Sequence, residues 1–312
     1  LVKLHDFIRE TLHNAQGRQL TSLEAHDICN QIAEIVVVGG VRRSSQISLS
    51  DLNDDEMRHA KDWPYPIKRA MANNSAIYRE KPTAAEFLQE WGSLAQSGTG
   101  ERGIFNLEAA QSKAPSRRYA PLIQGTNPCG EIMLRDMEFC NLSEVVVRPE
   151  DDLDSLLDKV ETAAWLGVIQ SSFTDFPYLR NQWKKNCDTE ALLGVSLTGQ
   201  MDNPSVLSSE ALSALKSRVI RIARKASTVL GTKMPVATTC VKPSGTVSQL
   251  VDSASGVHPR YSQYYIRRYR IAGRDPLFTM MKDMGIPCSP ETGQTEEDAS
   301  TWVLEFPVKA PE

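Results

Sequence analysis

The sequence lacks the features that mark a membrane or secreted protein. Its longest apolar runs, residues 35–41 and 163–169, have seven residues each, whereas a membrane helix needs roughly 20. The first ten residues carry charges throughout, so we expect no signal peptide. We therefore expect a soluble, cytoplasmic protein that contacts no membrane.

An excess of positive charge is also lacking. The chain has 35 Lys and Arg against 39 Asp and Glu, a net charge of −4, which argues against a general nucleic-acid binder. With 18 Gly and 17 Pro in 312 residues, a collagen-like or low-complexity chain is excluded. The composition is that of a globular protein, and the length suits about two domains or one large α/β barrel.

Metal-binding spacings are missing as well. No C-x-x-C pair and no His/Cys spacing typical of zinc occurs among the six cysteines, which are Cys29, Cys129, Cys140, Cys187, Cys240 and Cys288. In a chain of this length without a secretion signal, a disulfide is more typically catalytic than structural. The chain starts at Leu1 and ends at Glu312 without a closing element, so we interpret it as an internal piece of a longer protein.

Helical and strand patterns alternate along the chain. Capping boxes at Thr21 and Thr83 predict helices over 21–35 and 83–98, and Asn53 is the expected cap of a short helix to about residue 61. Apolar spacing predicts further helices over 153–169, 209–230 and 275–285, and Leu212 is among the residues of the second helix that are expected to face inward. Strands are predicted over 43–50, 191–198 and 302–306. Because no linker divides the chain, this pattern predicts a single α/β unit with mostly parallel strands.

The densest group of reactive side chains lies in residues 125–132, GTNPCGEI. In a strand, Asn127, Cys129 and Glu131 would share one face. In a loop, the proline and glycines would fix a tight course that turns Cys129 outward. Either geometry brings an amide, a thiol and a carboxylate together, although an isolated C-x-E is also typical of a turn with a buried structural cysteine.

Three further segments carry polar or reactive groups. Cys140 lies in EFCNLS, a half-buried strand by composition, and taken alone is typical of a core cysteine. Residues 242–248, KPSGTVS, suit a loop whose N–H groups point at an anion, but they lack the P-loop spacing. Residues 258–270 are rich in arginine and tyrosine and suit either nucleic acid, a solvent-facing strand or a phosphate clamp.

Together and in this order, the segments resemble the catalytic core of ribonucleotide reductases, most closely the adenosylcobalamin-dependent class II enzymes. Residues 127–132 look like the finger loop of the family, and Pro243, Ser244, Gly245 and Thr246 look like its phosphate-binding turn. The resemblance spans roughly residues 25–275 and includes the segments 37–44 (VVGGVRRS), 72–75 (ANNS, with Asn74 and Ser75 as substrate-binding candidates), 193–199 (LGVSLTG) and 258–260.

The resemblance implies a ten-stranded α/β barrel with a central finger loop, of which residues 1–312 are the catalytic core. It also implies a thiyl radical on Cys129 that takes the ribose 3′ hydrogen, Glu131 as general base, and Asn127 as the residue that holds the 2′-OH. Cys140 would be one of two thiols that end as a disulfide. The implied cofactor is adenosylcobalamin (coenzyme B12), and the implied partners are a ribonucleotide substrate, a thioredoxin-type reductant and a dNTP effector, in a monomer or homodimer.

Some of the family's parts are not found in this sequence. The first redox cysteine should lie on an early strand, whereas Cys29 falls in a predicted helix, so we expect the partner of Cys140 upstream of Leu1. The C-terminal cysteine pair is also missing from residues 1–312, and Cys187, Cys240 and Cys288 are predicted to be structural. This fragment alone is therefore expected to lack turnover.

Two alternatives stay open at this point. A diiron-dependent class I ribonucleoside-diphosphate reductase would share Cys129, Glu131 and Cys140, and Tyr264 and Tyr265 resemble its radical-relay pair. A non-catalytic nucleotide-binding module would keep only the phosphate turn. The residues flanking Cys129 and the Ser-Gly-Thr turn look more like class II. The class II members that this sequence resembles include monomeric triphosphate reductases, so we expect a triphosphate substrate.

Overall fold

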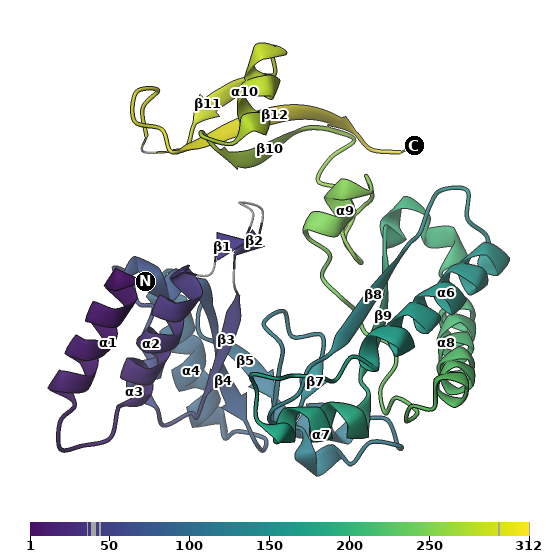
Figure 1. Cartoon of the computed structure of the whole chain (residues 1–312), viewed down its shortest axis with the longest axis horizontal. Helices are drawn as coiled ribbons and strands as arrows, with labels where there is room; N and C mark the ends of the chain where they lie inside the picture. Colours follow the sequence, from purple (N-terminus) through teal and green to yellow (C-terminus); the bar gives the residue numbers. More distant parts are fainter. Residues whose placement is uncertain (36, 39–41, 44, 293, 312) are drawn as a thin grey trace. The chain divides into compact units, whose positions relative to one another are not determined.

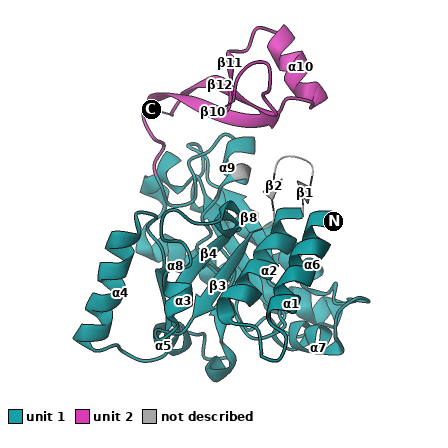
Figure 2. Ribbon diagram, turned by 90° about the vertical axis from the view of Figure 1, so that its left-hand side faces the viewer, with its two compact units in different colours: residues 1–35, 45–258 teal, residues 36–44, 259–312 magenta. Residues whose placement is uncertain are grey.

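The computed structural model describes residues 1–35, 37–38, 42–43, 45–292 and 294–311. It divides into two compact units (Figure 2): the first comprises Leu1–Ile35 and Ser45–His258, and the second comprises Val36–Ser44 and Pro259–Glu312. The sequence pattern predicted a single unit. Most of the segment 37–44 noted for its resemblance has no described side chains, and residues 39–41 and 44 lie outside the described residues.

The first unit opens with a parallel sheet of three strands in the order β3 (Gln46–Ser50), β4 (Ala72–Tyr78) and β5 (Gly103–Asn106). Helices α1 (Val2–Asn14), α2 (Ser22–Ile35), α3 (Asp55–Arg58) and α4 (Ala84–Ser97) accompany it (Figure 1). The predicted helices over 21–35 and 83–98 are confirmed, and each has its capping box, Thr21 with Glu24 and Thr83 with Glu86. The predicted cap Asn53 is wrong, because the side chain of Asp54 accepts the bond from Met57 N.

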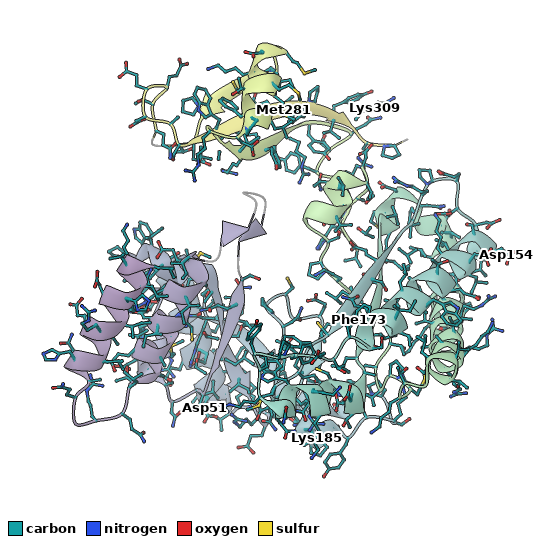
Figure 3. The ribbon with its side chains drawn as sticks, in the orientation of Figure 1. Asp51, Asp154, Phe173, Lys185, Met281 and Lys309 are labelled. Atoms are coloured by element: carbon teal, nitrogen blue, oxygen red, sulfur yellow. The ribbon has the colours of Figure 1, made fainter. Side chains whose placement is uncertain are left out.

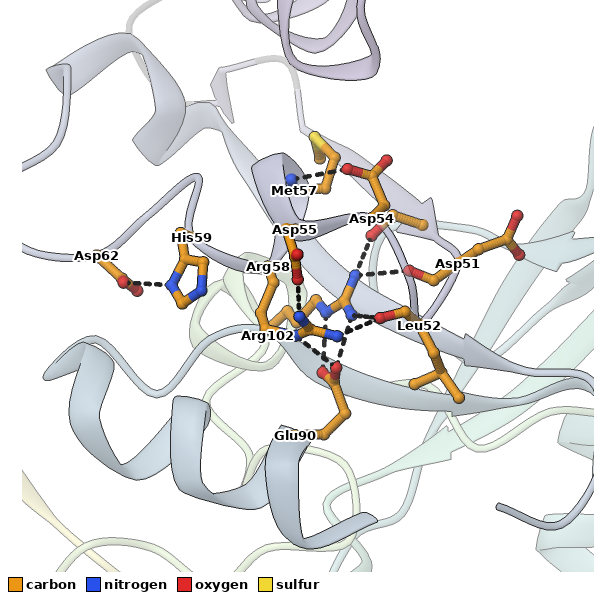
Figure 4. A network of polar contacts seen from close by, with 11 residues as sticks. Asp51, Leu52, Asp54, Asp55, Met57, Arg58, His59, Asp62, Glu90 and Arg102 are labelled. Atoms are coloured by element: carbon orange, nitrogen blue, oxygen red, sulfur yellow. Dashed lines mark hydrogen bonds and ion pairs between the residues drawn. The ribbon is translucent and has the colours of Figure 1, made fainter. Parts of the chain in front are cut away.

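A buried ionic network fixes the end of β3 to α4 (Figure 4). Glu90 of α4, whose side chain is 7% exposed, accepts from Arg58 Nε at 2.7 Å and from Arg102 Nη2 at 2.8 Å. The Arg102 guanidinium also donates to Ser50 Oγ at 2.8 Å and to two backbone carbonyls after β3. The two arginines share one buried carboxylate. Removal of the Glu90 carboxylate would therefore leave both guanidinium groups without this buried partner.

The second part of the first unit is a parallel pair, β8 (Asn141–Val146) and β9 (Leu193–Thr198), which confirms the buried strand predicted near 191–198. Helices α6 (Leu153–Ser171) and α8 (Ser209–Leu230) lie against this pair and against each other, and their apolar stripes form its core. Leu212 of α8 was predicted to face inward, but it is 41% exposed, so the prediction for this residue is wrong. The core of this part includes Leu156, Val160, Ala163, Leu215, Val219 and Ile222.

The remaining elements of the first unit are short. They are η1 (Ile67–Met71), α5 (Leu107–Ser112), η2 (Ala120–Leu122), β6 (Gly125–Thr126), β7 (Met133–Leu134), α7 (Asn181–Glu190), η3 (Gln200–Asp202), η4 (Pro204–Val206) and α9 (Thr246–Leu250). In the described part of the chain, no helix has the length and apolar character that crossing a bilayer requires.

The second unit is built on an antiparallel sheet in the order β10 (Tyr264–Ala272), β12 (Thr301–Lys309) and β11 (Cys288–Pro290). The helix α10 (Pro276–Asp283), capped by Asp275, packs on it, with Met281 against the small core and Lys309 at the end of β12 (Figure 3). The short strands β1 (Val37–Val38) and β2 (Arg42–Arg43) pair with each other. The predicted last helix and last strand are confirmed, and the arginine- and tyrosine-rich segment is β10.

The strands are parallel only in the first unit. Its sheets have at most three strands, and the residues described here form no closed barrel, so the ten-stranded barrel remains a prediction. The α/β character predicted from the sequence is confirmed. The mostly parallel organisation does not extend to the second unit, where β10 and β12 pair antiparallel.

Gly194 in β9 gives a test of the packing around this sheet. A Cβ on Gly194 would lie 2.6 Å from Leu142 Cδ2, 2.8 Å from Ile132 Cδ1 and 2.9 Å from Cys240 Sγ. Gly194→Ala is expected to lower the free energy of unfolding by about 1–3 kcal/mol, because three neighbours must move at once. Urea unfolding measures this. The control is Gly92→Ala in α4, where no atom lies within 4 Å and a gain of about 0.5–1 kcal/mol is expected.

Candidate functional site

The finger loop is a tight hairpin that presents Cys129 at its tip. Strands β6 and β7 pair antiparallel on either side of residues 127–132. Asn127 closes the loop twice, since its N–H donates to Ile132 O at 3.1 Å and its Oδ1 accepts from Ile132 N at 3.0 Å. Gly130 has a φ of +81°, which favours glycine, and its N–H donates to Asn127 O. Cys129 is exposed as a result, so the outward loop geometry is the one the structure adopts.

The neighbouring strand β4 holds this tip. Asn73 Nδ2 donates to Pro128 O at 2.9 Å, directly before Cys129. By the period of two, Ser75 shares that face of β4 with Asn73, whereas Asn74 faces the other way. Sequence reasoning chose Asn74 and Ser75 and missed Asn73.

Asn74 lies on the helix-covered face of the sheet. It is 3% exposed, and neither polar atom of its side chain has a hydrogen-bond partner among the residues that the structure describes. It pairs in register with Ser48, whose hydroxyl lies 2.7 Å from His26 Nδ1 of α2. The Asn74 side chain, which was expected to contact the substrate, therefore faces away from the finger loop. The alternation of exposure along β4 is the signal that separates the two asparagines, and it depends on knowing which face the helices cover.

Glu131 is buried beside a cation that the sequence reasoning did not single out as a site residue. Its carboxylate is 1% exposed, Oε1 accepts from Lys242 Nζ at 2.9 Å, and Oε2 has no hydrogen-bond partner within the described structure. Lys242 directly precedes the predicted phosphate turn, so one ion pair links the finger loop to that turn. A buried carboxylate with one oxygen unsatisfied is suited to accept a proton or a hydrogen bond from a ligand.

Two thiols, those of Cys140 and Cys240, lie close enough to the Glu131 carboxylate for its charge to affect their pKa values. Burial, with a contribution from the Glu131 carboxylate, raises the pKa of Cys140 to about 11 and that of Cys240 to about 12. Cys140 directly precedes β8, which pairs with one edge of β9. The segment that contains Cys240 lies along the other edge of β9, where Cys240 N donates to Val195 O. Both thiols therefore stay protonated at neutral pH. Cys240, predicted to be structural, is thus brought near Cys140 by the sheet.

A buried arginine ties the finger loop to the segment that carries Cys140. Arg118 donates to Met133 O of β7 at 2.8 Å, and its guanidinium lies 2.6 Å from Glu190 and 3.3 Å from Glu138. Burial, together with the neighbouring Glu190 charge, raises the pKa of Glu138 to about 8. Arg118 therefore fixes the spacing between the two cysteine-bearing segments.

The predicted phosphate turn adjoins the same site. Ser244 is 3% exposed and its hydroxyl donates to Glu144 Oε2 of β8 at 3.1 Å, so in this structure it is not open to a ligand. Gly245 is exposed, precedes α9, and has no atom within 4 Å of an added Cβ. Pro243 is exposed beside it, and the side chain of Thr246 lies outside the described residues.

The other cysteines lie elsewhere. Cys29 is exposed on α2, as the predicted helix requires, Cys187 is buried in α7 and accepts from Phe139 N at 3.4 Å, and Cys288 belongs to the second unit. All six are free thiols. No cluster of His, Cys, Asp or Glu among the described residues has the arrangement of a metal site.

Comparison with known proteins agrees with the resemblance. The chain is 31% identical to an adenosylcobalamin-dependent ribonucleoside-triphosphate reductase of Levilactobacillus brevis, over 99% of this chain and 45% of the relative. It is 28% identical to that of Lactobacillus leichmannii, over 97% of this chain and 44% of the relative. The chain thus spans about half the length of the curated relatives it matches. No family model matches it.

Solved structures give the same result. A B12-dependent class II ribonucleotide reductase superposes with a TM-score of 0.73 at 26% identity, covering 98% of this chain and 46% of that one. The alpha subunit of the class Id ribonucleotide reductase of Actinobacillus ureae has a TM-score of 0.56 at 14% identity over 85% of this chain and 57% of that one, a likeness of fold alone. The resemblance to the ribonucleotide reductase family is therefore confirmed: along nearly its whole length, this chain is homologous to about half of an adenosylcobalamin-dependent class II reductase.

Proposed function

We propose that this chain provides the catalytic centre for reduction of a ribonucleoside triphosphate to the 2′-deoxyribonucleotide. The observation that carries the proposal is the finger loop itself: an exposed Cys129 stands two residues from a buried Glu131 that keeps one carboxylate oxygen free. The names of the relatives favour this reaction over a class I diphosphate reductase and over a non-catalytic module.

The residues present fit the cofactor that the relatives' names imply. Cys129 is exposed, and the neighbouring Gly130 has no atom within 4 Å of an added Cβ, so the loop tip leaves room for a bulky group. Residues 128–130 would lie against adenosylcobalamin, which when bound supplies an organic radical able to take a hydrogen atom from a thiol. The chain's own task is to position that thiol, which the contact between Asn73 and Pro128 supports.

The roles of the site residues are those that the family resemblance implies, and their positions are compatible with them. The Cys129 thiyl radical takes the ribose 3′ hydrogen, and Glu131 Oε2 takes the proton of the 3′-OH while Lys242 holds Oε1. Asn127 uses Oδ1 to close the loop, which leaves its amide N–H₂ for the 2′-OH. The 2′-OH leaves as water, and two thiols, one of them Cys140, supply two electrons and two hydrogens and become a disulfide. Cys129 then returns the hydrogen atom to C3′, which restores the thiyl radical. A thioredoxin-type reductant would restore the thiols. We further propose that a dNTP acts as an effector and that the full-length protein is a monomer or a homodimer.

The partner of Cys140 is expected outside residues 1–312. Peptide mapping of the full-length enzyme, stopped after one turnover with a limiting amount of reductant, should find Cys140 cross-linked to such a cysteine. Cys240→Ser is the control and should leave the cross-link intact. A Cys140–Cys240 link would instead make the sheet neighbour the redox partner and contradict the expectation.

Substrate phosphates are proposed to contact the turn at residues 243–246 through backbone N–H groups. Gly245 is exposed and uncrowded, so a Val side chain is tolerated by the fold but stands where an anion would approach. Gly245→Val should raise the nucleotide dissociation constant about ten- to a hundredfold, the effect of losing one or two charge-assisted hydrogen bonds. Titration calorimetry with the nucleotide measures this; equal weakening for the nucleoside would show that the turn does not contact phosphate.

The function as a whole is tested by reduction of a ribonucleoside triphosphate with the full-length protein and a dithiol reductant, in parallel reactions with an iron chelator and with added iron. Deoxyribonucleotide should form only when adenosylcobalamin is added. Product formation without it, dependent on iron, would favour the class I alternative. Nucleotide binding without product under both conditions would favour the non-catalytic module.

A further inference from the structure

A second concave site lies in the first unit, between the loop that follows α5 and the helix α8. The cavity has a volume of about 760 Å³, within the range of small-molecule sites. Four basic residues line it: Lys113, Arg117 and Arg118 from the loop side, and Lys216 from α8. Apolar groups, including Phe105 and Ile220, form other parts of the wall.

The positive charges of this cavity are not balanced by carboxylates. Within the described structure, Lys113 and Lys216 have no ion pair, and Arg117 donates only to neutral oxygens, Pro235 O at 3.0 Å and Thr238 Oγ1 at 3.4 Å. Arg224 adds a fourth cation nearby, and burial together with that charge lowers the pKa of Arg117.

The acidic residue in the lining is already engaged. Glu131 is paired with Lys242, and the remaining lining arginine, Arg118, is paired with Glu190. The cavity thus keeps three positive charges in a chain whose net charge is −4. Like charges that converge on a concave surface repel one another, and a bound anion removes that repulsion.

We propose that this cavity binds a phosphate-bearing anion of nucleotide size, with Arg117 as its anchor. Pro235 and Thr238 hold the Arg117 guanidinium through Nε and Nη2, so its remaining N–H groups can form the paired hydrogen bonds that suit a phosphate. Lys113 and Lys216 add point charges from opposite walls, and Phe105 and Ile220 offer apolar surface to a base. None of residues 243–246 of the phosphate turn lines this cavity, whereas Glu131 of the proposed catalytic site forms part of its wall.

Site-resolved lysine acetylation of the full-length protein tests the proposal without an activity readout. Lys113 and Lys216 are exposed and react in the free protein. Tripolyphosphate should slow their acetylation about tenfold at saturation, as measured by mass spectrometry of the peptides. Lys225 is the internal control, because nine residues along α8 place it on the opposite side of the helix from Lys216. A second experiment with ATP distinguishes a nucleotide from inorganic polyphosphate. If ATP gives half-protection at a lower concentration than tripolyphosphate does, the apolar wall of the cavity contacts the base.

Arg117→Gln should raise the half-protecting concentration of tripolyphosphate about ten- to a hundredfold, and Arg117→Lys should recover part of the loss. Lys225→Gln removes one positive charge from the same helix and should leave protection unchanged. Protection of Lys225 equal to that of Lys216, or protection that survives Arg117→Gln in a folded protein, would overturn the proposal. Because the readout is binding, a failure here leaves the proposed reduction untouched, and the reverse also holds.

Discussion

Cys129→Ser in the full-length enzyme is expected to abolish reduction while nucleotide binding stays nearly intact. A hydroxyl has a much stronger bond to hydrogen than a thiol, so a serine at this position cannot form the radical that takes the ribose 3′ hydrogen. The exposed loop tip tolerates the change, because the contacts that shape the loop come from the Asn127 side chain and the backbone of Gly130, not from the thiol.

Release of tritium from 3′-labelled substrate measures this effect directly. Calorimetric titration of the same variant with nucleotide shows whether the site is still formed. Cys288→Ser is the matched control, since Cys288 lies in the second unit and should release tritium at the wild-type rate. Tritium release by Cys129→Ser would remove Cys129 from the mechanism.

Glu131→Gln is the second large effect that we expect, a loss of about 10²–10⁴-fold in kcat, the usual contribution of a general base. The amide cannot accept the 3′-OH proton. It also gives up the charge-assisted bond to Lys242 Nζ, so unfolding should become easier by about 1–3 kcal/mol. Activity and stability therefore fall together in this variant and have to be separated.

The double variant Glu131→Gln/Lys242→Met separates them. Replacing the lysine removes the charge that faced the lost carboxylate, so stability should recover in part. Turnover should not recover, because the base is still missing. A double variant that regains turnover would show that Glu131 acts only through the ion pair, and steady-state kinetics beside thermal unfolding decide between the two.

Local sequence patterns determined most of the secondary structure, although they left open whether residues 125–132 form a strand or a loop. The capping boxes at Thr21 and Thr83 place the starts of α2 and α4, because the atoms that cap a helix lie within three residues of each other. Likewise, Pro128 and Gly130 flank Cys129 directly, and a turn of this length is closed by its own residues. The order of the motifs was enough to identify the family.

Contacts between distant segments were decided only by the tertiary structure. Lys242 reaches Glu131 from 111 residues away, and Asn73 reaches Pro128 from 55 residues away. Which of two adjacent asparagines faces the loop depends on the side of β4 that the helices cover, and no local pattern in ANNS contains that information. The same holds for Ser244, whose hydroxyl is directed to Glu144 by the neighbouring strand.

The candidate reactive groups could therefore be recognised in the sequence where they are neighbours along the chain, as Asn127, Cys129 and Glu131 are. It was not readable where burial and pairing set their properties. The high pKa of Cys140, the free oxygen of Glu131 and the unbalanced charges around Arg117 all arise from side chains brought together by the packing of β8, β9 and α8. Desolvation and charge proximity act through space, so only the folded chain determines them.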